Sequence, residues 1–163
     1  MLKKVLGILW RRAPKRLRRL GVYVSEARFT VTAGAVVIDE EGRILLLKHV
    51  FRVGSGLGIP GGFISKGEQP EEAIRRELRE EVDLEIEGLE LAFVRTLRHV
   101  NQIEIIFVCR PSGPARANSF EVKRIDWFAP DSLPRELSRD QRNIIDRALS
   151  RRPVEEEATD GEW

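Results

Sequence analysis

Hydrophobic and polar positions follow two different periods along the chain, one typical of strands and one typical of helices. Residues 28–38 (RFTVTAGAVVI) are rich in β-branched side chains and alternate over their first part. A charged turn then leads into a second predicted strand at 43–49 (RILLLKH). Three further segments are strand candidates: 89–97, 102–109 and 124–128.

Two segments have the helical period. Residues 68–82 repeat an aliphatic side chain at every fourth position, through Ile74, Leu78 and Val82. Residues 138–149 predict a closing helix that begins at a serine cap. Residues 51–62 hold five glycines and are expected to form a loop. Strands that surround two helices indicate an α/β or α+β sandwich.

Composition and charge describe one ordinary globular domain with distinctive ends. The 163 residues are 42% hydrophobic and 33% charged, and the net charge is +2. Residues 1–20 carry eight Lys or Arg and no acid, whereas 154–163 carry five acids and no base. We therefore expect a basic amphipathic arm over 1–27, one domain over 28–150 and a disordered acidic tail over 151–163. The single cysteine excludes an internal disulfide, which suits a cytoplasmic location.

The basic arm leaves three roles open. Its longest apolar run, residues 5–10, is too short to span a bilayer. The arm can pack on its own domain or on the partner subunit of a homodimer. It can instead bind anionic lipid or RNA through its charge.

Carboxylates crowd the second half of the helix predicted at 68–82. Glu77 and Glu81 are four residues apart and Glu80 lies between them, so the three cover about 100° of the helix surface. This arc lies beside the aliphatic stripe, and the Pro-Gly-Gly turn at Gly61 precedes the helix. A solvated helix face is one explanation. The other is an all-oxygen site for Mg²⁺ or Mn²⁺, since glycine lets backbone carbonyls approach a ligand closely.

The complete spacing of these residues resembles a known motif, and this resemblance favours the metal site. Gly62, five residues, Glu68, seven residues and then RELREEVDL resemble the Nudix box, G-x5-E-x7-R-E-U-x-E-E-x-G-U, where U is a bulky aliphatic residue. Asp83 stands where the family has glycine. That glycine ends the helix in a left-handed conformation, which Asp also tolerates. The resemblance covers roughly 30–150 and implies a Nudix-type α/β/α sandwich around a mixed β-sheet.

The resemblance also implies a reaction and a ligand set. Nudix enzymes hydrolyse a nucleoside diphosphate linked to another group, with Mg²⁺ or Mn²⁺ as cofactor. The metal ligands that it implies are Glu77, Glu80, Glu81 and the carbonyl of Gly61. Arg76 would orient the acids through charge-assisted hydrogen bonds, and Glu77 and Arg76 together belong to the catalytic set.

Further candidates lie outside the box. The family commonly adds an acid from a later loop as a base or extra ligand, and Glu121 is our candidate, with Glu104 as the alternative. Leu57 occupies the position where members with a base-stacking aromatic often show Trp. The side chains that we expect to contact substrate are Phe51, Arg52, Phe63 and His99.

Two other functional classes remain open. One is a Nudix-like nucleotide-binding module without catalysis. Such a module is expected to have lost residues of the box, whereas here the box acids are all present. The other is a hydrolase that the basic arm directs to RNA 5′ ends or to a membrane.

Overall fold

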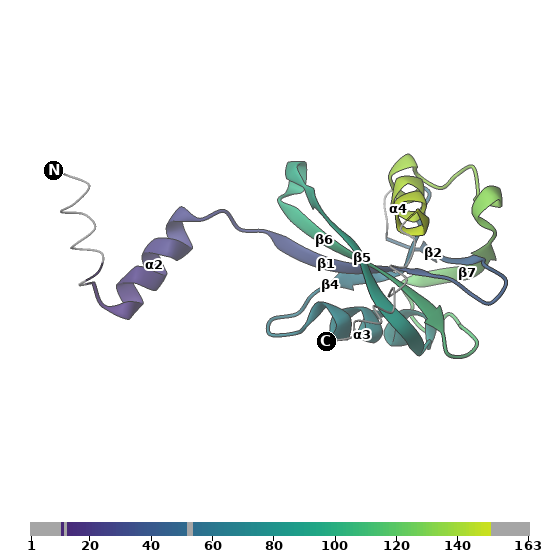
Figure 1. Cartoon of the computed structure of the whole chain (residues 1–163), viewed down its shortest axis with the longest axis horizontal. Helices are drawn as coiled ribbons and strands as arrows, with labels where there is room; N and C mark the ends of the chain where they lie inside the picture. Colours follow the sequence, from purple (N-terminus) through teal and green to yellow (C-terminus); the bar gives the residue numbers. More distant parts are fainter. Residues whose placement is uncertain (1–10, 12, 52–53, 151–163) are drawn as a thin grey trace, which may run out of the picture.

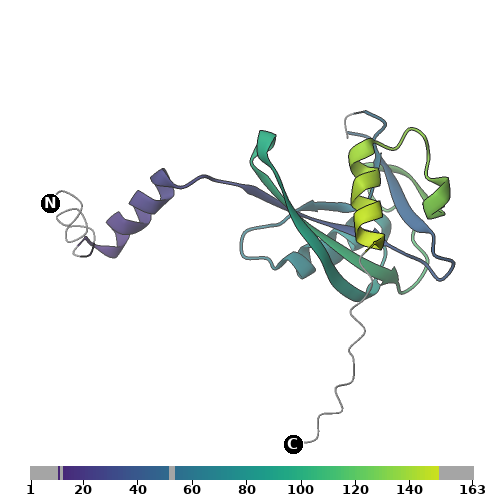
Figure 2. The ribbon, with the colours of Figure 1, turned by 45° about the horizontal axis from the view of Figure 1, so that its top comes forward.

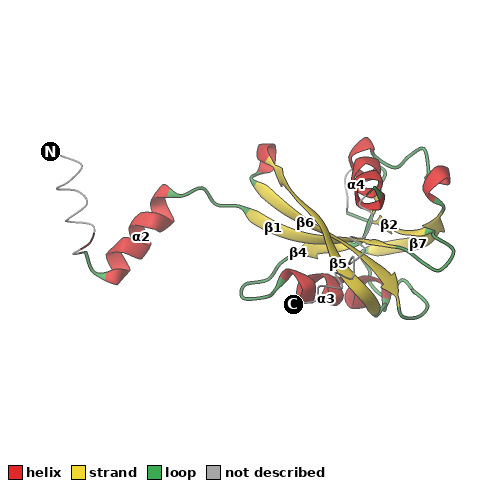
Figure 3. Cartoon of the chain, viewed as in Figure 1, coloured by secondary structure: helices red, strands yellow, loops and turns green. Residues whose placement is uncertain are grey.

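The computed structural model describes residues 11, 13–51 and 54–150 of the chain. Its helices and strands are α2 (Lys15–Ser25), β1 (Thr30–Val37), β2 (Ile44–His49), β3 (Leu57–Gly58), β4 (Gly61–Phe63), α3 (Pro70–Val82), β5 (Ile86–Leu97), β6 (Gln102–Pro111), β7 (Val122–Phe128) and α4 (Arg139–Leu149), with short 3₁₀ turns η1 (Arg98–Val100) and η2 (Pro130–Ser132). Figure 3 shows the two kinds of element by colour. All the predicted strands and both helices of the domain are present.

The strands form two sheets. The first is mixed, in the order β4-β1-β6-β5, with β1 parallel to β6 and the other pairs antiparallel. The second is antiparallel, in the order β3-β2-β7. The two strands predicted at 28–38 and 43–49 therefore belong to different sheets, and only the bridge between Ile38 and Ile44 joins them directly.

The two helices of the domain cover opposite sides of these sheets, as Figure 1 shows for α3 and α4. One buried cluster joins α3 to Val37, Leu45 and Phe107, and the other joins α4 to Val36 and Leu46. Because β2 is covered on both sides, its first four residues are all buried instead of alternating. The predicted α/β class and sandwich arrangement are confirmed.

Several element boundaries differ from the sequence prediction by a few residues, and the loop expected over 51–62 contains β3 and the start of β4. Helix α3 begins at Pro70 instead of residue 68, because proline lacks an N–H and suits the first helical position. The carboxylate of Glu72 accepts a hydrogen bond of 3.0 Å from the N–H of Gln69, which closes this end. Strand β5 begins at Ile86 instead of residue 89, because a register shift near Gly88 breaks the alternation there.

The helix α2 stands apart from the domain. Figures 1 and 2 both show it away from the sheets, at the end of an extended segment that leads into β1. Helix α2 therefore does not pack on the domain. Residues 1–10 and the tail at 151–163 lie outside the described residues. Within the described part of the chain, no helix is long and apolar enough to cross a membrane.

Candidate active site

The acid-bearing face of α3 is positioned by its aliphatic stripe. Ile74, Leu78 and Val82 are completely buried against the sheets. Glu77 and Glu81 follow the same side of the helix, and Glu81 is only 7% exposed. A carboxylate that is buried to this extent needs partners in order to stay charged.

The helix ends as the resemblance implies. Asp83 adopts a left-handed conformation with φ 50° and ψ 41°, and its N–H donates to the carbonyl of Arg79. The bond from Asp83 is that of the αL motif, and the N–H of Leu84 also donates to the carbonyl of Leu78 at 3.2 Å. Asp83 thus replaces the family's glycine without changing how the helix terminates.

Strand β4 brings two glycines against the carboxylates. Gly61 pairs with Gly34 and has φ 148°, and a Cβ added to it would lie 2.4 Å from the carbonyl oxygen of Ala33. A Cβ added to Gly62 would lie 2.3 Å from Oε1 of Glu77. Gly61 therefore requires glycine for its backbone, whereas Gly62 leaves the space that the Glu77 carboxylate occupies.

Arg76 connects the loop, the strand and the helix. Its Nε and Nη2 donate to the two carboxylate oxygens of Glu68 at 2.8 and 3.1 Å. Its Nη1 donates to Glu77 at 2.8 Å and to Glu80 at 3.2 Å, and its Nη2 also donates to the carbonyl of Phe63 at 3.1 Å. All five N–H groups of the guanidinium are used, so its orientation is fixed.

The electrostatics follow from these contacts. The hydrogen bond from Arg76, helped by the N–H of Ser65, lowers the pKa of Glu68 to about 2. The hydrogen bonds that Arg76 donates to Glu68 and Glu77 raise the pKa of Arg76. This ion pair keeps Glu68 and Arg76 charged at neutral pH.

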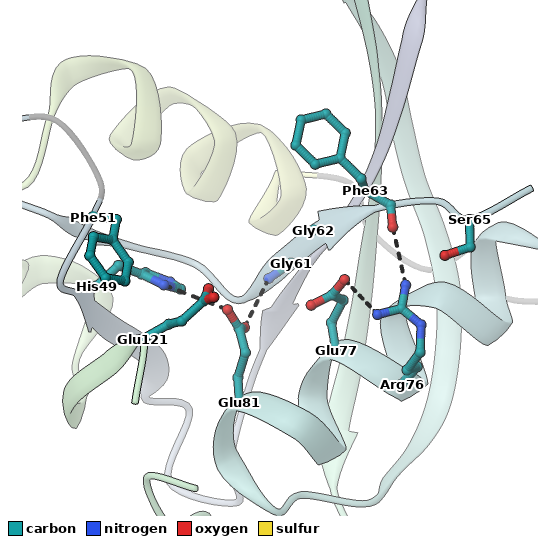
Figure 4. A pocket seen from close by; sticks show the side chains of 10 residues that line it. All are labelled: His49, Phe51, Gly61, Gly62, Phe63, Ser65, Arg76, Glu77, Glu81 and Glu121. Carbon is teal, nitrogen blue, oxygen red and sulfur yellow. Dashed lines mark hydrogen bonds and ion pairs between the residues drawn. The ribbon is translucent and has the colours of Figure 1, made fainter. Parts of the chain in front are cut away.

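A pocket of about 360 Å³ opens over these groups (Figure 4). Its lining residues come from β2, β4, α3 and the loops next to them: His49, Phe51, Gly61, Gly62, Phe63, Ser65, Arg76, Glu77, Glu81 and Glu121. At its centre, the N–H of Gly61 donates to Glu81 Oε2 at 3.4 Å, and Nδ1 of His49 lies 3.6 Å from Glu81 Oε1.

Most of the residues singled out in the sequence meet in this pocket. Two of the described ones do not line it. Glu80 is exposed over 61% of its side chain and is bonded to Arg76. His99 is exposed in the η1 turn between β5 and β6, beside Asp140, whose pKa is lowered chiefly by a hydrogen bond from Arg95 and in part by the charge of His99. Arg52 lies outside the described residues.

The two candidate acids beyond the box are also separated. Glu121 lines the pocket, at the end of the loop before β7. Glu104 instead accepts a hydrogen bond of 2.5 Å from Arg95, which also bonds to Asp140 on α4. These ion pairs join β6 to α4, and Glu104 is not among the residues that line the pocket.

Sequence reasoning missed His49 and Ser65. His49 reaches the pocket because β2 ends beside α3, 32 positions before Glu81 in the chain. No local pattern marks that approach. The alternation of β2 would have placed His49 on one face, but the sequence does not say which face meets the helix.

The donor set fits a divalent cation in part. Glu77 and Glu81 bring hard carboxylate oxygens to one pocket, and Gly62 leaves the space in which Glu77 lies. Over residues 11, 13–51 and 54–150, no group of three or more His, Cys, Asp or Glu side chains has the arrangement of a ready metal site. The structure thus brings two of the three predicted carboxylate ligands together.

Comparison with known protein families agrees with this arrangement of site residues. A family model described as the NUDIX domain matches residues 28–148. The chain belongs to the Nudix family. The match covers all the domain strands, α3 and all but the last residue of α4, and it leaves α2 outside.

Relatives within the Nudix family carry several names. The chain is 30% identical over 110 residues to a MutT-like protein of Streptomyces ambofaciens, covering 67% of this chain and 70% of that protein. It is 28% identical over 106 residues to the NAD-capped RNA hydrolase NudC of Chromobacterium violaceum, covering 64% of this chain but only 40% of that protein. The crystal structure of a MutT NUDIX hydrolase from Burkholderia pseudomallei superposes with a TM-score of 0.66 at 27% identity, covering 74% of this chain and 98% of that one. These similarities support a Nudix pyrophosphohydrolase.

Proposed function

We propose that the chain hydrolyses a diphosphate bond in a nucleoside diphosphate linked to another group, with Mg²⁺ or Mn²⁺ as cofactor. The observation that carries this proposal is the pair of carboxylates, Glu77 and Glu81, that faces one pocket from a single helix. A diphosphate is itself anionic, so these acids alone would repel it. A cation between the acids and the substrate removes that conflict.

The residues that would hold the metal are Glu77, Glu81 and the carbonyl of Gly61, with Glu80 joining if it leaves Arg76. When bound, the cation neutralises charge on the diphosphate oxygens and lowers the pKa of water toward attack at neutral pH. Arg76 holds Glu77 at 2.8 Å, so this acid is oriented before any ligand arrives.

Glu121 is the proposed general base. It lines the pocket from the loop before β7, and Figure 4 shows its side chain pointing toward Glu81. In the reaction, the oxygen of water forms a bond to phosphorus and its proton passes to the Glu121 carboxylate. The bridging oxygen leaves with the second phosphate. The position of Glu104 in an ion pair with Arg95 supports the choice of Glu121.

The substrate panel that tests this function covers nucleotide sugars, ADP-ribose, dNTPs and 5′-capped RNA, each with Mg²⁺ or Mn²⁺. The name of the NudC relative supports including NAD-capped RNA, although this chain spans 40% of that protein's length. We expect turnover of at least one substrate, loss of turnover on chelation and recovery when Mg²⁺ is restored. Turnover that survives chelation would contradict the metal role, and a protein that binds nucleotides without cleaving any of them would support the non-catalytic module.

Glu81→Gln distinguishes the two classes further. It should lower kcat by orders of magnitude while the fold remains, because the amide keeps the shape and loses the charge. Glu71→Gln is the matched control, since Glu71 is exposed in the first turn of the same helix. It should leave kcat unchanged.

A further inference from the structure

Two exposed aromatic rings stand at the rim of the pocket. Phe51 lies in the loop after β2, and Phe120 lies in the loop before β7. Their ring centroids are 6.3 Å apart and their planes meet at 70°, an edge-to-face contact. Phe51 lines the pocket itself, and Phe120 directly precedes the pocket residue Glu121.

The backbone brings these two rings together. The N–H of Val50 donates to the carbonyl of Glu121 at 2.8 Å, which joins the two loops next to the rings. The loop before β7 is closed by Ser119, whose hydroxyl accepts from the N–H of Glu121 at 3.1 Å. These bonds hold the backbone next to both rings, so the two loops that carry Phe51 and Phe120 lie side by side.

The exposure of both rings needs an explanation. Phe51 is 71% exposed and Phe120 is 82% exposed, although each could bury a large apolar area in a core. Neighbouring Val50 is also 52% exposed, so the rings belong to a small apolar rim beside a charged pocket. Apolar rims of this kind next to a few fixed polar groups are typical of ligand sites.

The charge of the pocket determines which part of a ligand reaches each end. The diphosphate of the proposed substrate belongs at Glu77 and Glu81, where a cation would lie. Figure 4 shows Phe51 on the His49 and Glu121 side of these acids, with Phe63 on the other side. A nucleoside that extends from the diphosphate toward Glu121 would bring its planar base to Phe51 and Phe120. Leu57, by contrast, is 2% exposed in β3 and offers no ring to a ligand.

We propose that Phe51 and Phe120 form a stacking subsite for the nucleobase of the substrate. This inference rests on the proposed diphosphate chemistry, and it adds the part of the substrate that the chain recognises. A base that stacks on an aromatic side chain contributes about 1–3 kcal/mol, and stacking tolerates different bases because every base has a π face. The subsite therefore selects nucleoside diphosphates over diphosphates that lack a base.

A binding experiment tests the subsite separately from catalysis. Calorimetry with Mg²⁺ compares ADP, GDP, CDP and UDP with inorganic pyrophosphate, which has the charge but no base. In the wild-type protein, at least one nucleoside diphosphate should bind about tenfold or more tightly than pyrophosphate. The double variant Phe51→Leu/Phe120→Leu should lose that advantage and keep its affinity for pyrophosphate. Phe29→Leu, a change in an exposed ring just before β1, is the control and should change neither affinity.

Three results would overturn the subsite. The first is a wild-type protein that binds no nucleoside diphosphate better than pyrophosphate. The second is a double variant that weakens both kinds of ligand equally, which would indicate a structural role. The third is a double variant that changes the oligomeric state in light scattering while its nucleotide affinities stay the same, which would assign the rings to a contact between copies. Failure of the hydrolysis panel leaves this affinity ratio measurable, so the two proposals fail separately.

Discussion

Replacing Gly62 by alanine tests how tightly the fold positions Glu77. The new methyl carbon would lie 2.3 Å from Oε1, 2.5 Å from the carboxyl carbon and 2.8 Å from Oε2 of Glu77. Ordinary contact begins near 3.4 Å, so the carboxylate must retreat by about 1 Å. Gly62 lies in extended strand β4 without a positive φ, so alanine strains only the side-chain space.

The expected effect is on catalysis and not on folding. A displacement of about 1 Å at a reacting group can cost roughly 100-fold in rate. Alanine at a backbone position that it can adopt usually stabilises by about 0.4–1 kcal/mol, which offsets part of the overlap. We therefore expect kcat/KM to fall by roughly 100-fold while the melting temperature stays within a few degrees.

A double variant provides the control. Shortening the displaced acid, in Gly62→Ala/Glu77→Asp, withdraws the carboxylate from the new methyl group. The two losses should therefore be less than additive in steady-state hydrolysis. Wild-type kcat/KM in Gly62→Ala, or a strictly additive double variant, would refute the close fit between the strand and the acid.

Three other perturbations have definite expected outcomes. The pKa of Glu68 is lowered from its ordinary value near 4.5 to about 2 by Arg76, so the pair stabilises the fold fully above about pH 4.5 and loses this effect as pH falls through about 2. Urea unfolding should show that Glu68→Gln is less stable than wild type at pH 6, with a smaller difference at pH 2.5; a difference that is independent of pH would contradict the assignment. Glu121→Gln should lower kcat by roughly 100-fold or more with little change in KM, whereas Glu104→Gln should keep kcat; the reverse result in steady-state kinetics would make Glu104 the base. Removal of residues 1–27 should leave kcat and the melting temperature unchanged on a small substrate, because α2 stands apart from the domain; a fall in either would show that the arm supports the site.

The sequence predicted the elements of the fold through their periodicity. The stripe of Ile74, Leu78 and Val82 correctly indicated which side of α3 is buried. The position of the nearby acids, at the edge of that side, followed from the stripe. Strand pairing could not be predicted in the same way. Residues 28–38 and 43–49 look like a hairpin in sequence, yet the partners of β1 are β4 and β6, which lie far along the chain.

The candidate site was predictable as far as the box extends. The motif predicted that one site contains Gly61, Arg76, Glu77 and Glu81, and all four line the pocket. Glu80 belongs to the same pattern, but its side chain is exposed. It forms an ion pair with Arg76 instead of lining the pocket.

Residues outside the box were harder to place. His49 and Phe120 lie on segments that approach the pocket only through tertiary packing and a loop contact. His99 was expected to contact substrate, but it lies in the turn between β5 and β6, beside Asp140 of α4. The sequence does not show in which direction this hairpin extends.

The proposed function requires that the acids of α3 hold a divalent cation for diphosphate hydrolysis. The most direct measurement is a Mn²⁺ titration followed by electron paramagnetic resonance, in wild type, Glu81→Gln and the control Glu71→Gln. We expect Mn²⁺ to bind wild type and Glu71→Gln with equal affinity, and binding to weaken at least tenfold in Glu81→Gln together with the loss of turnover. Undiminished Mn²⁺ affinity and turnover in Glu81→Gln would contradict the account.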